Sequence, residues 1–400
     1  MTDQTNTPEL RFPEFKKEWQ CNTLDNCCYK ISDGIHSTPI YSKSGDFSFI
    51  NGNNLINGKI HFENAKLVDS KEALKHKRNL TYNETILLSI NGTIGNIALY
   101  RGEKIILGKS AAYINIKANF LNPLFLYYFL ETNSLQRYFR SELTGTTIKN
   151  LSIKSIKKTK LYIPNITEQR KIGDFFSKLD RQIELEEKKL ELFEQQKRGY
   201  MQKLFSQELR FKDENGNEYP NWQTVKIGSI LKERKERSGD GEMLSVTINH
   251  GIVKFDDIDR KDNSSKDKSN YKKVYKNDIA YNSMRMWQGA SGKAEFDGIV
   301  SPAYTVVTPI ENINSSFIAY YFKTHNMIHK FRINSQGLTS DTWNLKYKQL
   351  KDIKINICSK EEQDKIADLL TILDTRIKKQ NHKLEILNIN KKGLLQKMFV

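Results

Sequence analysis

The sequence predicts an α+β chain in which two similar mixed α/β domains are joined by two long antiparallel coiled-coil helices, with pseudo-twofold symmetry. Three observations lead to this prediction: a long internal repeat, a heptad pattern within it, and an echo of the N-terminus after the first copy. The predicted segments, in chain order, are a first domain over 1–164, a repeated helix over 165–206, a second domain over 207–357 and a second repeated helix over 358–400.

The internal repeat joins two stretches that lie 194 positions apart. Residues 168–180 read EQRKIGDFFSKLD, and residues 362–374 read EQDKIADLLTILD. Further along, KRGYMQKLF at 197–205 returns as KKGLLQKMF at 391–399. A repeat of this length indicates two copies of a domain-sized unit and not a short-period solenoid.

The repeated segments predict helices that begin near Asn165 and Ser359. Each of these residues fits an N-cap, with Glu168 or Glu362 three positions on to complete a capping box. Apolar residues then follow in alternating steps of four and three, which is typical of a coiled-coil seam of about five heptads. These residues are Ile172, Phe176, Leu179, Ile183, Leu190, Phe193, Tyr200 and Leu204 in the first copy, and Ile366, Leu370, Leu373, Ile377, Leu384, Leu387, Leu394 and Met398 in the second.

Both seams are polar at the same two positions. These are Glu186 and Lys197 in the first copy, and Gln380 and Lys391 in the second. Matching polar positions are expected when two helices pack on each other, because polar seam residues fix the register. The alternative is that each helix packs only on its own domain, although such helices usually carry a wider apolar stripe.

The N-terminus repeats the sequence that follows the first helix. Residues 9–12, followed by Trp19, match residues 208–211, followed by Trp222. The chain therefore begins with the sequence that, by analogy with the first copy, is expected to follow its last helix. This pattern favours antiparallel helices that bring the two chain ends together.

The segments between the repeated helices have strand character and a weaker similarity to each other. Residues 85–90, 104–107 and 113–116 alternate or cluster apolar residues as strands do, and so do 299–300 and 304–307. We also align Tyr127, Tyr128 and Phe129 with Tyr320, Tyr321 and Phe322. The two domains are therefore expected to share a fold and to differ in their loops.

The net charge of +17 indicates a polyanionic partner, although an excess of lysine also serves solubility. Residues 1–164 hold 22 basic and 14 acidic side chains, and residues 207–357 hold 24 and 19, while the repeated helices are nearly balanced. The positive charge is thus concentrated in the divergent segments, where a nucleic-acid surface is expected.

Several function classes are not supported by any motif. The N-terminus is polar and no apolar run approaches the ~18 to 20 residues that cross a bilayer, so we expect no signal peptide, no membrane segment and a cytoplasmic protein. The four cysteines form no C-x-x-C pair, so neither a zinc site nor a disulfide framework is predicted.

Two stretches resemble enzyme motifs but depart from them. Gly102 and Gly108-Lys109-Ser110 resemble a phosphate-binding loop, yet five residues separate the glycines instead of four, and a strand-like pattern follows where the motif needs a helix. Residues 122–125 lack the second proline of the adenine-methyltransferase motif. The sequence therefore predicts no catalytic residues and no cofactor bound by this chain.

Polar loops remain as candidate recognition surfaces. The turn at 33–39 is rich in short donors and acceptors, and the segment 282–288 places an arginine, an indole and a glutamine after a strand, a chemistry suited to reading bases. The loops at 144–149 and 336–343 occupy equivalent places before the final strands. The alternative is that Met286 and Trp287 are core residues and that the others are plain surface loops.

The predicted DNA-binding residues are His36, Ser37, Thr38, Lys43, Asn91, Thr93, Thr146, Thr147, Lys149, Arg285, Trp287, Gln288, Ser340, Thr342 and Trp343.

The order of domain, helix, domain and helix resembles the specificity subunit of Type I restriction-modification systems over essentially the whole chain. The most specific residues of this resemblance are the two repeated segments and Asp33-Gly34 with His36 and Pro39. The resemblance implies a non-catalytic subunit that binds double-stranded DNA. Each target-recognition domain would read one half of a split site, and the helix pair would set the spacer between the halves.

The resemblance also implies partners and their cofactors. Two methyltransferase subunits, which bind S-adenosylmethionine and methylate adenine, would dock on this chain. Restriction subunits, which use ATP and Mg²⁺ for translocation and cleavage, would complete the complex. The competing hypotheses are a self-sufficient DNA methyltransferase or nuclease, and a coiled-coil scaffold without a DNA role, which predicts no salt-dependent affinity for DNA.

Overall fold

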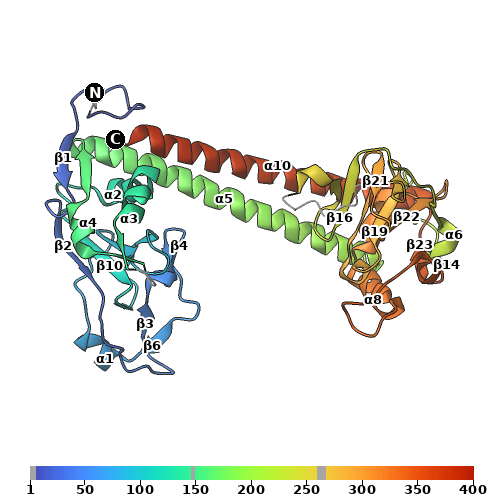
Figure 1. Ribbon diagram of the computed structural model, residues 1–400, viewed down its shortest axis with the longest axis horizontal. Helices are drawn as coiled ribbons and strands as arrows, with labels where there is room; N and C mark the ends of the chain where they lie inside the picture. The colour runs from blue at the N-terminus through green and yellow to red at the C-terminus, as the bar shows by residue number, and fades with distance from the viewer. Residues whose placement is uncertain (1–5, 146–148, 259–266) are drawn as a thin grey trace. The chain divides into compact units, whose positions relative to one another are not determined.

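The computed structural model describes residues 6–145, 149–258 and 267–400 (Figure 1). The chain divides into two compact units, one of residues 1–187 with 382–400 and one of residues 188–381. Helices α5 (Ile166–Phe205) and α10 (Lys360–Met398) each begin in one unit and end in the other. Within the described ranges no helix is both long enough and apolar enough to span a bilayer.

The first unit contains a four-stranded antiparallel sheet in the order β2-β10-β7-β8, of which β2 and β10 are labelled in Figure 1. Its strands are β2 (Cys28–Asp33), β10 (Ala111–Ile116), β7 (Thr85–Ser89) and β8 (Ile97–Leu99). Every residue of β7 is buried, as expected for an apolar strand covered on both faces. The strands predicted at 85–90 and 113–116 are therefore confirmed.

A second, three-stranded sheet of this unit has the order β6-β3-β9, and its β3 and β9 run parallel. Its strands are β6 (Lys66–Val68), β3 (Phe47–Ile50) and β9 (Ile105–Leu107). Three strand pairs complete the unit: β4 (Leu55–Ile56) with β5 (Lys59–Ile60), β11 (Leu143–Thr144) with β12 (Asn150–Leu151), and β1 (Gln20–Thr23) with β13 (Lys160–Ile163).

The helices of the first unit are short apart from α5 and α10. They are α1 (Ser70–Lys75), α2 (Pro123–Glu131), α3 (Asn133–Ser141) and α4 (Ile153–Lys158). Asn122 begins α2 by accepting the amide of Phe125, and Thr132 begins α3 in the same way. Proline occupies the first position of α2, where its missing amide donor costs the helix nothing.

The second unit has a related architecture with two four-stranded sheets in its described residues. Its sheets have the orders β15-β22-β19-β20 and β17-β16-β21-β18, and a further pair joins β14 to β23. The strands are β14 (Gln223–Lys226), β15 (Leu231–Glu233), β16 (Met243–Thr247), β17 (Gly251–Lys254), β18 (Lys272–Val274), β19 (Ile279–Asn282), β20 (Ser291–Lys293), β21 (Gly298–Val300), β22 (Tyr304–Pro309) and β23 (Lys354–Ile357). The helices are α6 (Ile227–Ile230), α7 (Ser315–Phe322), α8 (His325–Asn334) and α9 (Tyr347–Leu350), with the 3-10 turns η2 (Phe255–Asp257) and η3 (Met286–Gln288).

The alignment of the tyrosines in α2 and α7 was wrong by one residue. Tyr128 donates to Asp180 at 2.8 Å, and Tyr320 donates to Asp374 at 2.7 Å. Both tyrosines lie six residues after the N-cap of their helix, so Tyr128 and not Tyr127 corresponds to Tyr320. The shared aspartate acceptor, which sits on the repeated helix, is what fixes the equivalence.

A buried carboxylate joins the start of α5 to the N-terminal segment. Glu168 is completely buried and accepts hydrogen bonds from Arg11 Nε at 2.6 Å, Arg11 Nη2 at 2.8 Å and Trp19 Nε1 at 3.3 Å. Asn165 caps α5 by accepting the Glu168 amide at 3.0 Å, as predicted. The predicted capping box is wrong in its second half, because the Glu168 carboxylate faces Arg11 and Trp19.

The second unit contains the same joint. Glu362 is also completely buried, and it accepts from Arg210 Nε at 3.1 Å, Arg210 Nη2 at 2.7 Å and Trp222 Nε1 at 3.2 Å. Ser359 caps α10 through the Glu362 amide at 3.4 Å. The repeated Arg and Trp of the N-terminal echo therefore have a structural role, which is to hold the glutamate at each helix start.

The N-terminal segment also meets the end of α10 inside the first unit. The Leu10 amide donates to the Lys397 carbonyl at 2.8 Å, and the equivalent Leu209 amide donates to the Lys203 carbonyl at 3.1 Å. The N-terminal segment lies beside the end of α10 there (Figure 1). In the first unit this contact is made between the two ends of the chain, whereas in the second it is made by continuous chain. The prediction that the N-terminus follows the last helix is confirmed.

The polar seam positions pair the helices in each unit. In the first unit Lys391 of α10 contacts Asp180 of α5 at 2.7 Å, and Lys383 pairs with Glu186. From Lys383 to Lys391 the residue number rises along α10, while the number of the α5 partner falls from 186 to 180. These segments of the two helices are therefore antiparallel. In the second unit Lys197 of α5 contacts Asp374 of α10 at 2.6 Å, which is the same pair with the helices exchanged.

Candidate nucleic-acid interface

In the first unit, the turn between β9 and β10 ties together three polar loops. The Gly108 amide donates to Ile50 at 2.8 Å, the Ile35 amide donates to Leu107 at 2.7 Å, and the Ile90 amide donates to Ser110 at 2.9 Å. These bonds fix the loops 33–39, 51–54 and 90–95 around one turn. Loops anchored to a scaffold in this way are a common place for binding residues.

Side chains reinforce this loop cluster. Ser110 Oγ accepts from the Gly52 amide at 2.9 Å and donates to Asn51 Oδ1 at 3.0 Å. Thr93 Oγ1 donates to the Gly52 carbonyl at 2.9 Å and lies 3.1 Å from Ser89 Oγ. Ser110, which belongs to the segment that resembled a phosphate-binding loop, therefore forms its hydrogen bonds within the protein. Strand β10 follows this segment, as the sequence pattern indicated.

The structure brings some of the predicted residues of this unit together. Asn91 forms an isolated bridge with Asn150, next to the exposed Lys149, and the Leu151 amide donates to Ile90 at 2.8 Å. Thr93 belongs to the same loop, but its hydroxyl is engaged with Gly52. Asn91 and Lys149 are therefore neighbours at the surface.

The other predicted residues of the first unit are more scattered. His36, Ser37 and Thr38 are exposed on the loop anchored to the β9–β10 turn, and the His36 ring lies 2.7 Å from an Asp33 oxygen. Lys43 is exposed beside β6 and takes no part in the hydrogen bonds of the loop cluster that join the described residues. Thr146 and Thr147 lie outside the described residues.

In the second unit, the predicted residues after β19 and before α9 meet. The rings of Trp287 and Trp343 lie 5.2 Å apart in an edge-to-face contact, and the Leu345 amide donates to Ser283 at 2.9 Å. This hydrogen bond corresponds to the one between Leu151 and Ile90 in the first unit. The same two loops are thus joined in both units.

The residues on these loops differ in exposure. Arg285 is exposed, Trp287 and Gln288 are half-buried in η3, and Met286 is completely buried. The alternative core role is therefore correct for Met286 and only partly correct for Trp287, whose Nε1 donates to the Met284 carbonyl at 3.1 Å.

Two further predicted residues lie on the loop before Trp343. Ser340 and Thr342 are exposed, and the Thr342 hydroxyl donates to the Thr339 carbonyl at 3.0 Å. This loop therefore presents Ser340 freely to solvent, while the Thr342 hydroxyl is shared with the backbone.

Two basic residues of these surfaces are missing from the predicted DNA-binding residues. Arg332, at the end of α8, is exposed and stacks its guanidinium over Trp343 at 5.5 Å. Lys109 is exposed on the turn that organises the first loop cluster. Arg332 follows Phe331 as Arg140 follows Phe139, so the weak internal repeat contains a signal that could have pointed to it.

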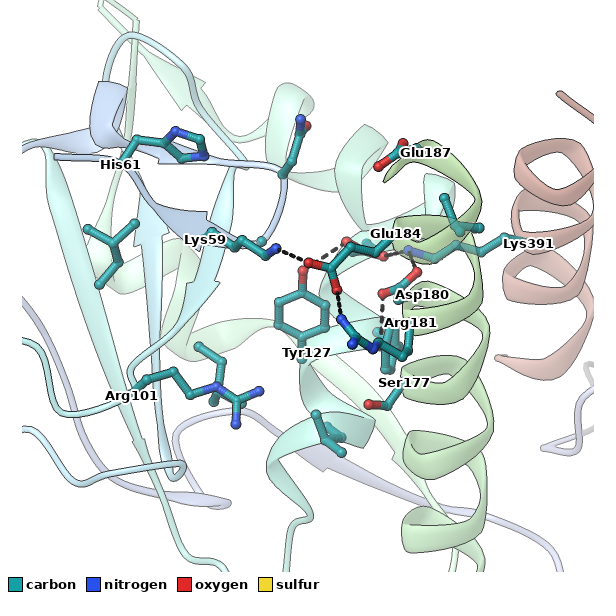
Figure 2. Close-up of a pocket in the computed structure, with 18 of the residues that line it drawn as sticks. Lys59, His61, Arg101, Tyr127, Ser177, Asp180, Arg181, Glu184, Glu187 and Lys391 are labelled. Carbon is teal, nitrogen blue, oxygen red and sulfur yellow. Dashed lines mark hydrogen bonds and ion pairs between the residues drawn. The ribbon is translucent and has the colours of Figure 1, made fainter. Parts of the chain in front are cut away.

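A crevice of about 970 Å³ in the first unit lies between the β4–β5 hairpin, α2, α5 and α10 (Figure 2). Glu184 of α5 projects into it and binds Lys59 of the hairpin at 3.0 Å and Arg181 at 2.7 Å. The Lys59–Glu184 ion pair therefore joins the hairpin to α5.

Lys391, which lines the same crevice, contacts Glu131 at 2.9 Å and Asp180 at 2.7 Å; Figure 2 shows Lys391 and Asp180. Burial alone would lower the pKa of Lys391, but the two carboxylates outweigh it and raise the pKa above its ordinary value. Lys391 is therefore charged over the physiological range. Its ammonium is a structural counter-ion that joins α10 to α2 and α5.

The family described as Type I restriction modification DNA specificity domain matches residues 16–195 and 219–388. Among curated proteins, the Type I restriction enzyme MjaVIII specificity subunit of Methanocaldococcus jannaschii is 28% identical over 154 residues, 37% of this chain and 35% of that protein. The putative MjaX specificity subunit of the same organism is 24% identical over 56% of each chain. The EcoBI specificity subunit of Escherichia coli is 22% identical over 41% of this chain and 35% of its own length.

The chain thus spans about half or less of the length of these curated relatives. Among solved structures, the S subunit of a Type I restriction-modification system from M. genitalium superposes with a TM-score of 0.61 at 20% identity, covering 98% of this chain and 99% of that one. A chain from a structure of a type I R-M system, described for its complex assembly and conformational transition, gives a TM-score of 0.53 at 14% identity, over 95% and 97% of the two chains. These superpositions show that the fold is shared.

Proposed function

The chain belongs to the family of Type I restriction modification DNA specificity domains, and from this premise we propose that it reads a bipartite DNA target, one half with each domain. One observation carries the proposal. Each of the two matched regions contains a cluster of polar loops, and an equivalent backbone hydrogen bond, Leu151 to Ile90 in one and Leu345 to Ser283 in the other, joins two loops of each cluster.

The chemistry of the two loop clusters fits DNA. Arg285 and Gln288 carry the side chains that read guanine and adenine in the major groove, and Asn91 has the same capacity for adenine. Lysines such as Lys43 and Lys149 supply phosphate contacts, which set the position of a protein on the duplex without reading its sequence. The unlike side chains of the clusters lead us to propose that the two half-sites differ.

The segments of the chain have distinct tasks in this proposal. Target-recognition domains over 1–164 and 207–357 bind the half-sites, and the helices over 165–206 and 358–400 set the number of base pairs between them. The continuous helices of 40 and 39 residues support this division.

Catalysis belongs to partner subunits in this proposal. Two methyltransferase subunits dock on the chain and use S-adenosylmethionine to methylate adenine, and restriction subunits add ATP- and Mg²⁺-dependent translocation and cleavage. The chain itself contributes recognition, and we place the complex in the cytoplasm because its DNA substrate lies there.

Deleting the gene for this chain should remove one bipartite methylation motif from the genome while other methylation persists. The measurement is a map of methylated adenines in DNA from cells with and without the gene. The control is the deletion strain carrying the gene on a plasmid, which should regain the motif. Identical maps with and without the gene would overturn the proposal.

Replacing Arg285 with alanine should broaden base preference in one half of that motif only. A good arginine–base contact contributes about 1–3 kcal/mol of discrimination, or roughly 10- to 100-fold. The matched control is Lys276→Ala, which removes one exposed positive charge at the opposite end of β19. Equal loss in both halves would show that Arg285 supports folding and does not read bases.

A further inference from the structure

In each unit, one loop that carries candidate base-reading residues ends at a glycine in the left-handed conformation. We define the first recognition loop as residues 91–95 and the second as residues 285–289. Gly95 has φ +92° and Gly289 has φ +85°. Since this conformation is accessible to glycine at little cost, it allows a sharp turn at the same point of both loops. The carbonyl of each glycine is then available as an acceptor.

In the first unit, a side chain of α3 holds this carbonyl. Gln136 Nε2 donates to the Gly95 carbonyl at 3.2 Å and to the Leu130 carbonyl, in the last turn of α2, at 2.8 Å. The amide thus ties the end of the first recognition loop to the α2–α3 hairpin. A Cβ added to Gly95 would lie 2.2 Å from Gln136 Oε1, which shows how closely the two residues approach.

In the second unit, an unrelated side chain holds the equivalent carbonyl. Lys323, directly after α7, donates from Nζ to the Gly289 carbonyl at 2.6 Å and to the Ile248 carbonyl at 2.8 Å. Ile248 belongs to the turn between β16 and β17. One ammonium therefore joins the second recognition loop to a loop of the other sheet.

The position of Lys323 is costly, which argues for a specific role. Burial, and to a lesser extent the neighbouring Lys197, lowers the pKa of Lys323 to about 8. Among the described residues its ammonium forms no ion pair, and its Nζ donates to the two carbonyls alone. A lysine at a helix end commonly binds the last carbonyls of its own helix, whereas both acceptors of Lys323 lie outside α7.

We propose that Gln136 and Lys323 are positioning residues for sequence recognition, each fixing one recognition loop through the carbonyl of its terminal glycine. This inference rests on the proposed function, because it assigns the purpose of the loops to DNA reading. Neither side chain touches DNA. The two domains perform the same task with different donors, a neutral amide in one and an ammonium in the other.

The test uses Gln136→Leu and Lys323→Met, which keep approximate size and remove the donor. Each variant replaces the wild-type gene in cells that hold the complete system, and methylated adenines are mapped. We expect base discrimination to fall about tenfold in one half of the motif, and in opposite halves for the two variants. The control is Lys330→Met, which removes another lysine-to-carbonyl bond, to Lys354 at 2.7 Å, away from the recognition loop. Its motif should equal the wild-type motif.

Two further comparisons separate positioning from general stability. Lys323→Arg retains donors at this position and should restore much of the discrimination that Lys323→Met loses. Amide hydrogen exchange on the purified chain should accelerate at 285–289 in Lys323→Met and at 91–95 in Gln136→Leu. If both variants keep the wild-type motif, or if each variant broadens the two half-sites equally, the positioning role of Gln136 and Lys323 is overturned while the proposed function stands. A wild-type chain that directs no motif would overturn the proposed function, and this inference with it.

Discussion

Replacing Glu168 with glutamine should destabilise the first unit by about 3 kcal/mol, a factor of roughly 100 in its opening equilibrium. Glu168 is completely buried, and it is the counter-ion of Arg11, whose side chain is 13% exposed. Glutamine preserves the size of the side chain but removes the charge and one of the acceptors that Arg11 and Trp19 share. Breaking one partner of a buried pair leaves the other charge uncompensated.

The measurement is amide hydrogen exchange of the sheet strands, because it reports on each unit separately while bulk unfolding of two units is not two-state. Exchange should accelerate in β7 and β10 and remain unchanged in β19 and β22. Glu362→Gln should give the reverse pattern, since Glu362 forms the same joint with Arg210 and Trp222.

The matched control is Lys157→Ala, because the ion pair of Lys157 with Asp25 lies at the surface, where the side chains are 42% and 53% exposed. Such pairs contribute at most about 1 kcal/mol. If Glu168→Gln and Lys157→Ala accelerate exchange equally, the buried pair is not what stabilises the first unit.

The contact of Glu168 with Arg11 and Trp19 was only partly predictable from the sequence. The sequence contained all of its parts, since Glu168 belongs to the long repeat and Arg11 and Trp19 belong to the N-terminal echo. The N-cap at Asn165 was predictable because capping depends on neighbours along the chain. The partner of the carboxylate was not, because Arg11 lies 157 positions away and competes successfully with the local capping amide.

The helices were the most predictable part of the fold, for a related reason. Their heptad pattern is a local regularity, and the two polar seam positions at Lys197 and Lys391 meet aspartates of the opposite helix in the structure. The domain strands were also recognised where they are strongly apolar, as in β7. Short edge strands such as those of the β4–β5 hairpin carry no comparable signal.

The candidate recognition surfaces were predicted as loops but not as side-chain arrangements. Turn-forming composition identified the segments, yet the hydroxyl of Thr93 turns inward, and Arg332 joins Trp343 only through packing of α8. Gln136 and Lys323 escaped notice because their acceptors are backbone carbonyls, which no residue type marks. Contacts of this kind depend on tertiary placement, so a single sequence does not reveal them.

The length of the repeated helices is expected to set the number of base pairs between the two half-sites. A seven-residue insertion, made after both Glu187 and Asn381, adds one heptad to α5 and one to α10 and keeps the seam in phase. At ~1.5 Å per residue, the addition lengthens each helix by about 10 Å. With base pairs spaced ~3.4 Å apart, the methylated motif should keep both half-sites and gain about three base pairs of spacer.

The map of methylated adenines measures this directly, and sites with the original spacing should lose methylation. Inserting five residues at the same two positions is the matched control, because the extra length is similar but the apolar seam is rotated out of register. That variant should lose the motif altogether. The five added residues would break the heptad phase between the Lys391–Asp180 pair and the Lys197–Asp374 pair, so both pairs could not lie on one continuous seam. An unchanged spacer in the seven-residue variant would contradict the role of the helices in setting the spacing, while leaving the reading of half-sites by the two loop clusters intact. The same experiment therefore separates the two tasks that the repeat and the divergent segments are proposed to perform.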